Sequence, residues 1–276
     1  MHRPTVSTLG GDPSVIALAL SGWRLWLTGW PDQAVDHAVR ALERAETLAH
    51  PLSLVNALAY AAHVRMWRGE CTEALVLAQR LAEVGRAHDF VAWEAAGMII
   101  QGSVWVQEGK RDCGLTLLTT GLAQYRRHGN RAALSSWLTS LAQAHLQGGQ
   151  VAEGLTVIEE ALQLTKTSFA RYWTPEMHRL QGELLLAQAG QARPATGPAP
   201  TTAEACFQQA LAMAQQQGAR ALELRAAISL SRLWLAQDQP AAHALVARCY
   251  NWFSEGLDTV DLQTAKSLLE RCQPMT

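Results

Sequence analysis

The first part of the chain alternates apolar stretches with helix-breaking points. From Asp12 to Thr28 the apolar residues cover more than one face of a helix, as is typical of an inner helix in a stack: Ile16, Leu18, Leu20, Trp23, Leu25, Trp26 and Leu27. Asp12 and Pro13 form a good N-cap and N1 pair, so this helix is expected to begin there. Gly29 and Pro31 then turn the chain into a second helix. The pattern predicts a helical hairpin.

This hairpin pattern repeats with a period of 40 residues. Small residues mark the period: Gly22, Ala62, Gly102, Ala142 and Gly182. Seven residues after each of them comes a turn signal: Gly29, Gly69, Gly109, Gly149 and the pair Ala189-Gly190. A fixed period of roughly 20 to 50 residues is typical of stacked supersecondary units. The sequence therefore predicts an all-α fold, a right-handed superhelical solenoid of about six helical hairpins with a C-terminal capping helix.

The expected boundaries follow from this register. A flexible tail should cover residues 1–11, and a single repeat domain residues 12–272. Its units are expected at 12–50, 51–89, 90–129, 130–169, 170–218 and 219–257, with the cap at 258–272. Prolines at 194, 198 and 200 exclude helix from residues 189–200, which are expected to form a loop inside the fifth unit. Asp258 and Asp261 are interpreted as the N-cap and N3 residues of the last helix.

The second helices carry small residues as well. They fall five positions after each turn: Ala34, Ala74, Gly114, Gly154 and, once the loop is discounted, Ala205. Helices that cross at the short end of the usual range of about 8 to 10 Å leave room only for glycine or alanine. The period alone favours HEAT or armadillo units, which repeat at about 40 to 47 residues. The paired small positions favour tetratricopeptide-like units with lengthened helices, and we give them more weight.

Composition narrows the class of function. The net charge is −1 with both signs interspersed, so neither nucleic acid nor a membrane surface is expected as a partner. Five cysteines without a C-x-x-C pair predict neither a disulfide framework nor a zinc site. The N-terminus has no signal-peptide pattern, which predicts a cytoplasmic protein. We find no H-E-x-x-H, G-x-S-x-G or Cys-His constellation, so no metal, cofactor or enzymatic activity is expected.

Several longer segments resemble one family. They include Gly29-Trp-Pro-Asp-Gln-Ala, Arg179-Leu-Gln-Gly-Glu-Leu-Leu-Leu-Ala-Gln, Leu222-Glu-Leu-Arg-Ala-Ala-Ile-Ser-Leu-Ser-Arg-Leu-Trp and Trp252-Phe-Ser-Glu-Gly-Leu-Asp. Over residues 10–272 the chain resembles the C-terminal tetratricopeptide region of bacterial multidomain regulators. In these regulators an adenylate/guanylate cyclase-type or DNA-binding output domain precedes a predicted ATPase module. The resemblance implies a role in signal transduction, in which the repeats sense a partner or ligand and bias the upstream module. The chain has no G-x-x-x-x-G-K-[ST] loop and no cyclase-like segment, so catalysis does not carry over.

The first helices of tetratricopeptide-like units line a concave groove. With the 40-residue period as register, the expected partner-binding groove residues are Trp23, Trp26, His63, Met66, Trp67, Ser103, Gln143, Arg179 and Glu183. This groove grades from aromatic to charged, which suits an extended or helical peptide with one apolar and one charged end. The partner would be a protein or peptide, such as an upstream ATPase or cyclase module. A metabolite held inside the superhelix is the alternative, and a purely structural spacer is a third.

Each candidate group also has a structural interpretation. The tryptophans could fill space between stacked units instead of anchoring a partner. Arg179 and Glu183, with Glu223 and Arg225 on the next first helix, could form an ion network that fixes the stacking of units five and six. Because no preceding unit is expected to cover Trp23 and Trp26, this N-terminal helix pair could also mediate self-association.

Overall fold

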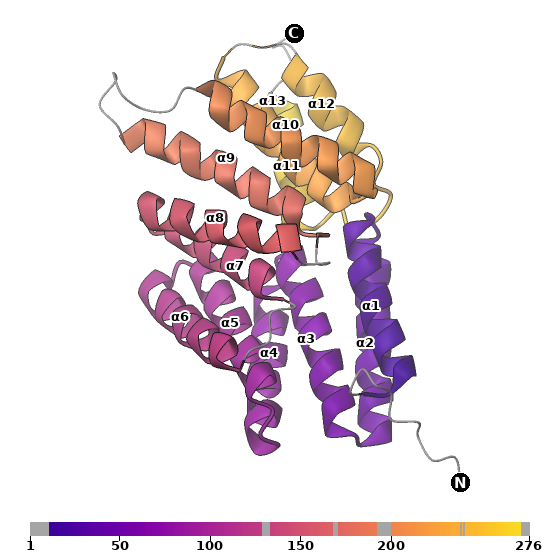
Figure 1. Ribbon diagram of the computed structural model, residues 1–276. Coiled ribbons are helices and arrows are strands. Elements are labelled where there is room, and N and C mark those ends of the chain that lie inside the picture. The colour runs from indigo at the N-terminus through magenta and orange to yellow at the C-terminus, as the bar shows by residue number, and fades with distance from the viewer. Residues whose placement is uncertain are drawn as a thin grey trace. The chain divides into compact units, whose positions relative to one another are not determined.

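The computed structural model describes residues 11–128, 133–167, 171–191, 200–237, 239 and 241–271. Within these residues the chain forms helices and turns and no strand (Figure 1). The helices are α1 (Pro13–Leu27), α2 (Pro31–Leu48), α3 (Pro51–Arg68), α4 (Cys71–Ala87), α5 (Val91–Gln107), α6 (Arg111–Arg127), α7 (Leu134–Gln147), α8 (Val151–Thr167), α9 (Thr174–Gln191), α10 (Pro200–Gln217), α11 (Arg220–Leu235), α12 (Ala241–Tyr250) and α13 (Val260–Arg271). The predicted fold class, helical hairpins followed by one further helix, is confirmed.

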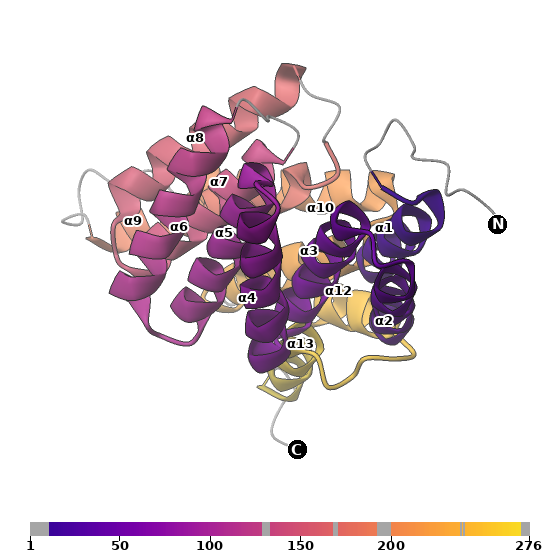
Figure 2. The same ribbon diagram turned by 90° about the horizontal axis from the view of Figure 1, so that it is seen from below.

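The helices fall into two compact units. The N-terminal unit comprises Met1–Trp26 and Trp30–Asn130, and the C-terminal unit comprises Leu27–Gly29 and Arg131–Thr276. In the N-terminal unit α4 packs against both α3 and α5, and α5 packs against α6 (Figure 2). In the C-terminal unit α9 contacts α8, α10 and α11, and α11 also contacts α12 and α13. The expectation of a single repeat domain over residues 12–272 remains a prediction.

Close helix crossings occur at the predicted small residues. A Cβ atom built on Gly102 of α5 would lie 2.6 Å from the carbonyl oxygen of Gly114, and one on Gly114 of α6 would lie 2.7 Å from that of Gly102. Likewise, a Cβ on Gly22 would lie 3.0 Å from the carbonyl oxygen of Ala34. Backbone therefore meets backbone at these crossings, and α5 and α6 could not approach so closely with larger residues at both positions.

The turns inside the hairpins share one hydrogen-bond pattern. Gly69, Gly109 and Gly149 adopt left-handed backbone conformations, with φ of 87°, 83° and 75°. At Gly69 the amide donates to the carbonyl of Met66, and the next amide, of Glu70, donates to that of Arg65. The same two bonds recur around Gly109 and Gly149. This is the Schellman arrangement that ends helices, and glycine is favoured in it because it has no Cβ.

The first helix begins where the sequence predicts. The Asp12 carboxylate accepts hydrogen bonds from the amides of Ser14, at 2.9 Å, and Val15, at 3.4 Å. Pro13 occupies the first helical position, where a missing N–H is not needed. The hydrogen bond from the Ser14 side chain and those from the two amides lower the pKa of Asp12 although burial opposes them. Residues 1–10 of the expected tail lie outside the described residues.

Two predictions near the C-terminal end are wrong. Ala205, the small position expected on α10, is exposed, and the aromatic ring of Phe207 faces Gly182 of α9, with 2.5 Å between the built Cβ and the ring. The register slipped because the length of the inserted loop, most of which (192–199) lies outside the described residues, cannot be read from the sequence. Asp258 and Asp261 are also not the N-cap and N3 residues, because α13 begins at Val260 and the amide of Gln263 donates to the carbonyl of Thr259, which makes Thr259 the N-cap. Asp261 instead forms an ion pair with Arg225 at 2.7 Å.

Candidate partner-binding faces

An aromatic cluster joins α1 and α3 in the N-terminal unit. The ring of Trp23 packs edge-on against Tyr60, with ring centroids 4.6 Å apart, and against His63, at 5.1 Å. Trp67 contacts Trp23 at 5.1 Å, Trp26 at 4.6 Å and His63 at 5.4 Å. Edge-to-face and tilted contacts at these distances are favourable for aromatic pairs. The cluster therefore fixes α1 on α3.

His63 is neutral within this cluster. Its side chain is buried, and Nδ1 donates a hydrogen bond to the carbonyl of Ala59 at 2.7 Å. Burial lowers the pKa of His63 to about 4, against a smaller opposing effect of the bond to Ala59. The protonated form is disfavoured because the surrounding rings replace water around the charge. His63 thus behaves as a packing residue at neutral pH.

The predicted groove residues differ in their access to solvent. Five are buried: Trp26, His63, Met66, Trp67 and Ser103. The hydroxyl of Ser103 is used within its own helix, where it donates to the carbonyl of Ile99 at 2.8 Å. Four are half-buried: Trp23, Gln143, Arg179 and Glu183. These four offer the accessible part of the predicted surface, two of them through charged groups.

A polar stripe on α7 accompanies Gln143. Ser136, Ser140 and Gln147 are also half-buried and lie at helical spacing from it, on one side of the helix. The hydroxyl groups of Ser136 and Tyr172 are 3.2 Å apart, within hydrogen-bond distance. Sequence reasoning singled out Gln143 alone and missed the stripe. The sequence does contain the pattern, because Ser136, Ser140, Gln143 and Gln147 follow one another by four, three and four residues.

A buried charge network connects α9, α11 and α13 in the C-terminal unit. Arg179 forms two hydrogen bonds with Glu176, at 3.0 and 2.8 Å, and a longer contact with Glu183, at 3.4 Å. Ser229 of α11 donates to Glu183 at 2.6 Å. Arg225 of α11 lies 3.7 Å from Glu176. These contacts match the interpretation of Arg179 and Glu183 as part of an ion network that joins α9 of one hairpin to α11 of the next.

The network sets the charge states of its members. Burial alone would raise the pKa of Glu176, but Arg179 and Arg225 more than offset it, and the pKa lies below its ordinary value. The same carboxylates raise the pKa of Arg179 against the effect of burial. Glu223, which we expected in this network, instead bonds Arg220 at 2.7 Å and Gln215 at 3.0 Å. Sequence reasoning missed Glu176, Ser229 and Asp261.

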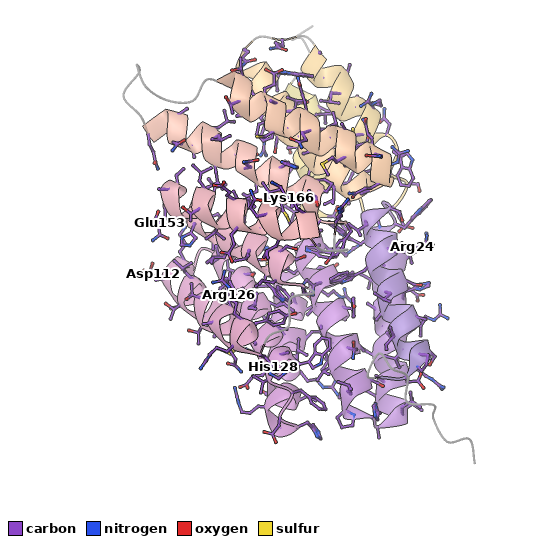
Figure 3. The ribbon with its side chains drawn as sticks, viewed as in Figure 1. Arg24, Asp112, Arg126, His128, Glu153 and Lys166 are labelled. Atoms are coloured by element: carbon purple, nitrogen blue, oxygen red, sulfur yellow. The ribbon has the colours of Figure 1, made fainter. Side chains whose placement is uncertain are left out.

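Charged side chains of the second helices point outward. Asp112 of α6 and Glu153 of α8 are exposed, and Figure 3 shows both at the surface of their helices.

Over the described ranges, we find no group of three or more His, Cys, Asp or Glu side chains that could hold a metal ion. In that same portion of the chain, no helix is long and apolar enough to cross a membrane.

Comparisons with known proteins identify the fold. No family model matches the sequence. An uncharacterized protein of Rhizobium meliloti (strain 1021) is 26% identical over 225 residues, which are 81% of this chain and 21% of that protein. The chain thus spans about one fifth of the length of this relative. Among solved structures, the crystal structure of the apo form of RapI is similar, with a TM-score of 0.58 and 11% sequence identity. The match covers 93% of this chain and 83% of that chain.

A weaker structural likeness is to a Podosopora anserina putative kinesin light chain with nearly identical TPR-like repeats. It is 20% identical, with a TM-score of 0.46, and the match covers 73% of this chain and 95% of that chain. The likeness to RapI and the hairpin geometry together show stacked, tetratricopeptide-like helical hairpins.

Proposed function

We propose that the chain is a non-catalytic protein-interaction module of a bacterial signal-transduction regulator, acting in the cytoplasm. The observation that supports it best is the fold itself, hairpins whose first helices carry aromatic, polar and charged side chains that are partly accessible. Stacked repeats build extended surfaces suited to binding a peptide or helix. The partner would be a protein segment, such as an upstream ATPase or cyclase module.

The proposed partner-binding residues lie on the first helices of the hairpins and form two sets, one in each compact unit. Trp23 contributes an aromatic edge in the N-terminal unit, with Trp26, His63, Met66, Trp67 and Ser103 as its buried support. Gln143 and the polar stripe of α7 contribute hydrogen-bonding groups in the C-terminal unit, and Arg179 and Glu183 contribute charges. A polar partner segment suits α7 because the partly accessible groups of its polar stripe are hydroxyls and amides.

The length of the bacterial relative supports a larger context. Because the matched region is 21% of that protein, a repeat module of this kind can be one part of a long polypeptide. We infer that the repeats of this chain act on other modules by binding them, and that the resemblance to bacterial regulators points to an ATPase or cyclase as the regulated module.

A matched pair of variants tests the proposal. Gln143→Arg places a long charge on the polar stripe of α7, whereas Gln79→Arg makes the same change at an exposed position of α4. Each protein is immobilised and exposed to lysate of the source organism. We expect the wild type and Gln79→Arg to retain the same partner and Gln143→Arg to lose it. Identical sets of bound proteins for all three would contradict the proposal.

A small-ligand sensor is the alternative function. It predicts a stability gain of about 2.7 kcal/mol when a metabolite is present at about 100 times its dissociation constant. A thermal-shift screen of nucleotides, sugars and lipids would detect such a gain. A hit that is lost in Gln143→Arg and kept in Gln79→Arg would favour the sensor.

A further inference from the structure

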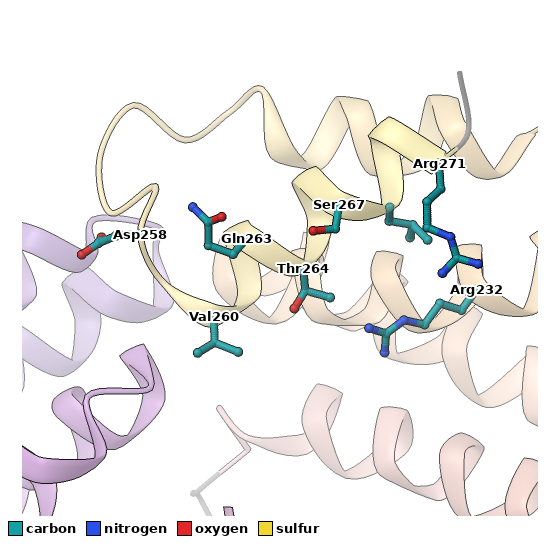
Figure 4. Close-up of a pocket in the computed structure, with 8 residues that line it drawn as sticks. Arg232, Asp258, Val260, Gln263, Thr264, Ser267 and Arg271 are labelled. Atoms are coloured by element: carbon teal, nitrogen blue, oxygen red, sulfur yellow. The ribbon is translucent and has the colours of Figure 1, made fainter. Parts of the chain in front are cut away.

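A hollow of about 430 Å³ opens on the C-terminal unit between α11 and α13. Its lining combines the apolar side chains of Val260 and buried Leu268 with polar and charged side chains. Figure 4 shows the side chains of Arg232, from α11, and Arg271, from α13, reaching into the same end of it. The hollow is open to solvent, so a ligand there would be held mainly through its polar and charged side chains.

The two arginines differ from the others on these helices. Arg220 and Arg225 each form an ion pair, at 2.7 Å, with Glu223 and Asp261 respectively. Arg232 and Arg271 are exposed and make no ion pair with any carboxylate of the described residues. Two guanidinium groups at one end of a hollow repel each other, and an anion between them would remove that repulsion.

Hydroxyl groups continue the wall of the hollow. Thr264, Ser267 and Arg271 follow one another on α13 by three and four residues and so lie along one side of the helix. Elsewhere a helical hydroxyl bonds the carbonyl four residues earlier, as that of Thr139 does to Ser135 at 2.8 Å. Within the described residues, the hydroxyls of Thr264 and Ser267 make no such bond, which leaves both available to a ligand.

The acidic group of the hollow lies away from the arginines. Figure 4 places Asp258 at the end opposite Arg232 and Arg271. The carboxylate of Asp258 therefore repels an anion at the arginine end only weakly. The separation also gives the hollow two chemically different ends, with Val260 and Gln263 between them.

We propose that this hollow binds the phosphate group of a phosphorylated small molecule, a site separate from the partner-binding face proposed above. The guanidinium groups of Arg232 and Arg271 and the hydroxyls of Thr264 and Ser267 together carry more hydrogen-bond donors than the two oxygens of one carboxylate can accept. A phosphate monoester has three strong acceptor oxygens and matches this set better. Arginine suits it because its planar fork pairs with two phosphate oxygens at once.

Isothermal titration of the whole chain with inorganic pyrophosphate, ADP and citrate tests the site. We expect pyrophosphate or ADP to bind the wild type at least tenfold more tightly than citrate does. Binding of ADP, with or without pyrophosphate, would support a phosphorylated small molecule as the ligand, whereas binding of pyrophosphate alone would show that the hollow takes only inorganic phosphate and would overturn the proposal. No binding of either phosphate, or citrate binding as tightly as both, would overturn the proposal.

Variants separate the site from diffuse positive charge. Arg232→Gln and Arg271→Gln should each weaken phosphate binding about tenfold, and Arg271→Lys should weaken it less because the charge remains without the fork. Lys266→Gln removes the same charge from an exposed position of α13 outside the hollow, and we expect its affinity to stay within about twofold of the wild type. An equal loss in Lys266→Gln would contradict a defined site. An unchanged thermal unfolding midpoint of each variant would show that the loss of affinity does not come from a loss of folding.

Discussion

Arg179 binds Glu176, three residues earlier on α9, through two hydrogen bonds of 3.0 and 2.8 Å, and their side chains are 14% and 9% exposed. Glu176→Gln leaves the guanidinium without its main counter-charge. Because the guanidinium then keeps only its longer ion pair, with Glu183, we expect the free energy of unfolding to fall by about 3 kcal/mol. Urea denaturation measures this change.

The exposed pair of Asp36 and Arg40 on α2 serves as the control. Their groups are 3.5 Å apart and more than half exposed, so Asp36→Asn should leave stability close to that of the wild type. If Glu176→Gln is equally mild, the network does not fix the stacking of α9 and α11.

The acid sensitivity of His63 gives a second prediction. Its pKa is about 4 in the folded chain and 6.5 when unperturbed, so between these values the unfolded chain binds one proton more. The free energy of unfolding therefore falls as the pH falls through this window, by up to about 3 kcal/mol from this group. His63→Phe keeps an aromatic ring and removes the proton site, so its stability should depend less steeply on pH between 6.5 and 4.

Thermal unfolding at several pH values checks this expectation. His243→Asn, at an exposed position of α12, is the matched control and should follow the wild-type slope. An unchanged slope in His63→Phe would mean that another group carries the acid sensitivity.

The crossing of α5 and α6 gives a third prediction. Gly102→Ala forces a methyl group to within 2.6 Å of the Gly114 carbonyl unless the helices separate. Such overpacking costs about 1–3 kcal/mol of stability. Gly190→Ala on α9 is the control, because no atom lies within 4 Å of its added methyl group, and alanine favours helix. Denaturant midpoints should fall for the first variant and stay or rise for the second.

Self-association gives a fourth prediction. We expected it through Trp23 and Trp26, but Trp26 is buried and Trp23 half-buried against α3, so these rings offer less free surface than an uncovered pair. Leu20 of α1 is the large apolar side chain there that remains exposed, at 46%. If the helix pair mediates dimers, Leu20→Lys should convert them to monomers in light scattering. The same mass for both proteins would exclude this surface.

The sequence could predict what depends on short separations along the chain. Gly102 and Gly114 lie twelve residues apart within one hairpin, so their spacing alone predicted the crossing that the structure contains. The partners of Arg225 could not be predicted in this way, because Asp261 lies 36 residues further along and Glu176 lies on another helix. The periodicity gives the face of a helix, whereas such contacts depend on how neighbouring helices are rotated and offset.

The same limit applies to the candidate site. The register puts Gln143 on α7 next to buried Ala142, and its role as a partner contact stays a prediction. The burial of His63 and Ser103, in contrast, follows from packing against neighbouring side chains. Accessibility depends on those side chains and is not a property of the repeat alone. Only the predicted residues that are accessible to solvent can contact a partner directly. Of these, Gln143 is the one that we choose to test.

Site-specific photo-crosslinking in cells of the source organism tests the interaction role most directly. A photoreactive amino acid replaces Gln143 on α7 in one protein and Gln79 on α4 in the other. The account predicts a discrete adduct with one partner protein from position 143, which disappears when excess unlabelled chain competes, and no such adduct from position 79. No adduct at position 143, or the same adducts at both positions, would contradict it.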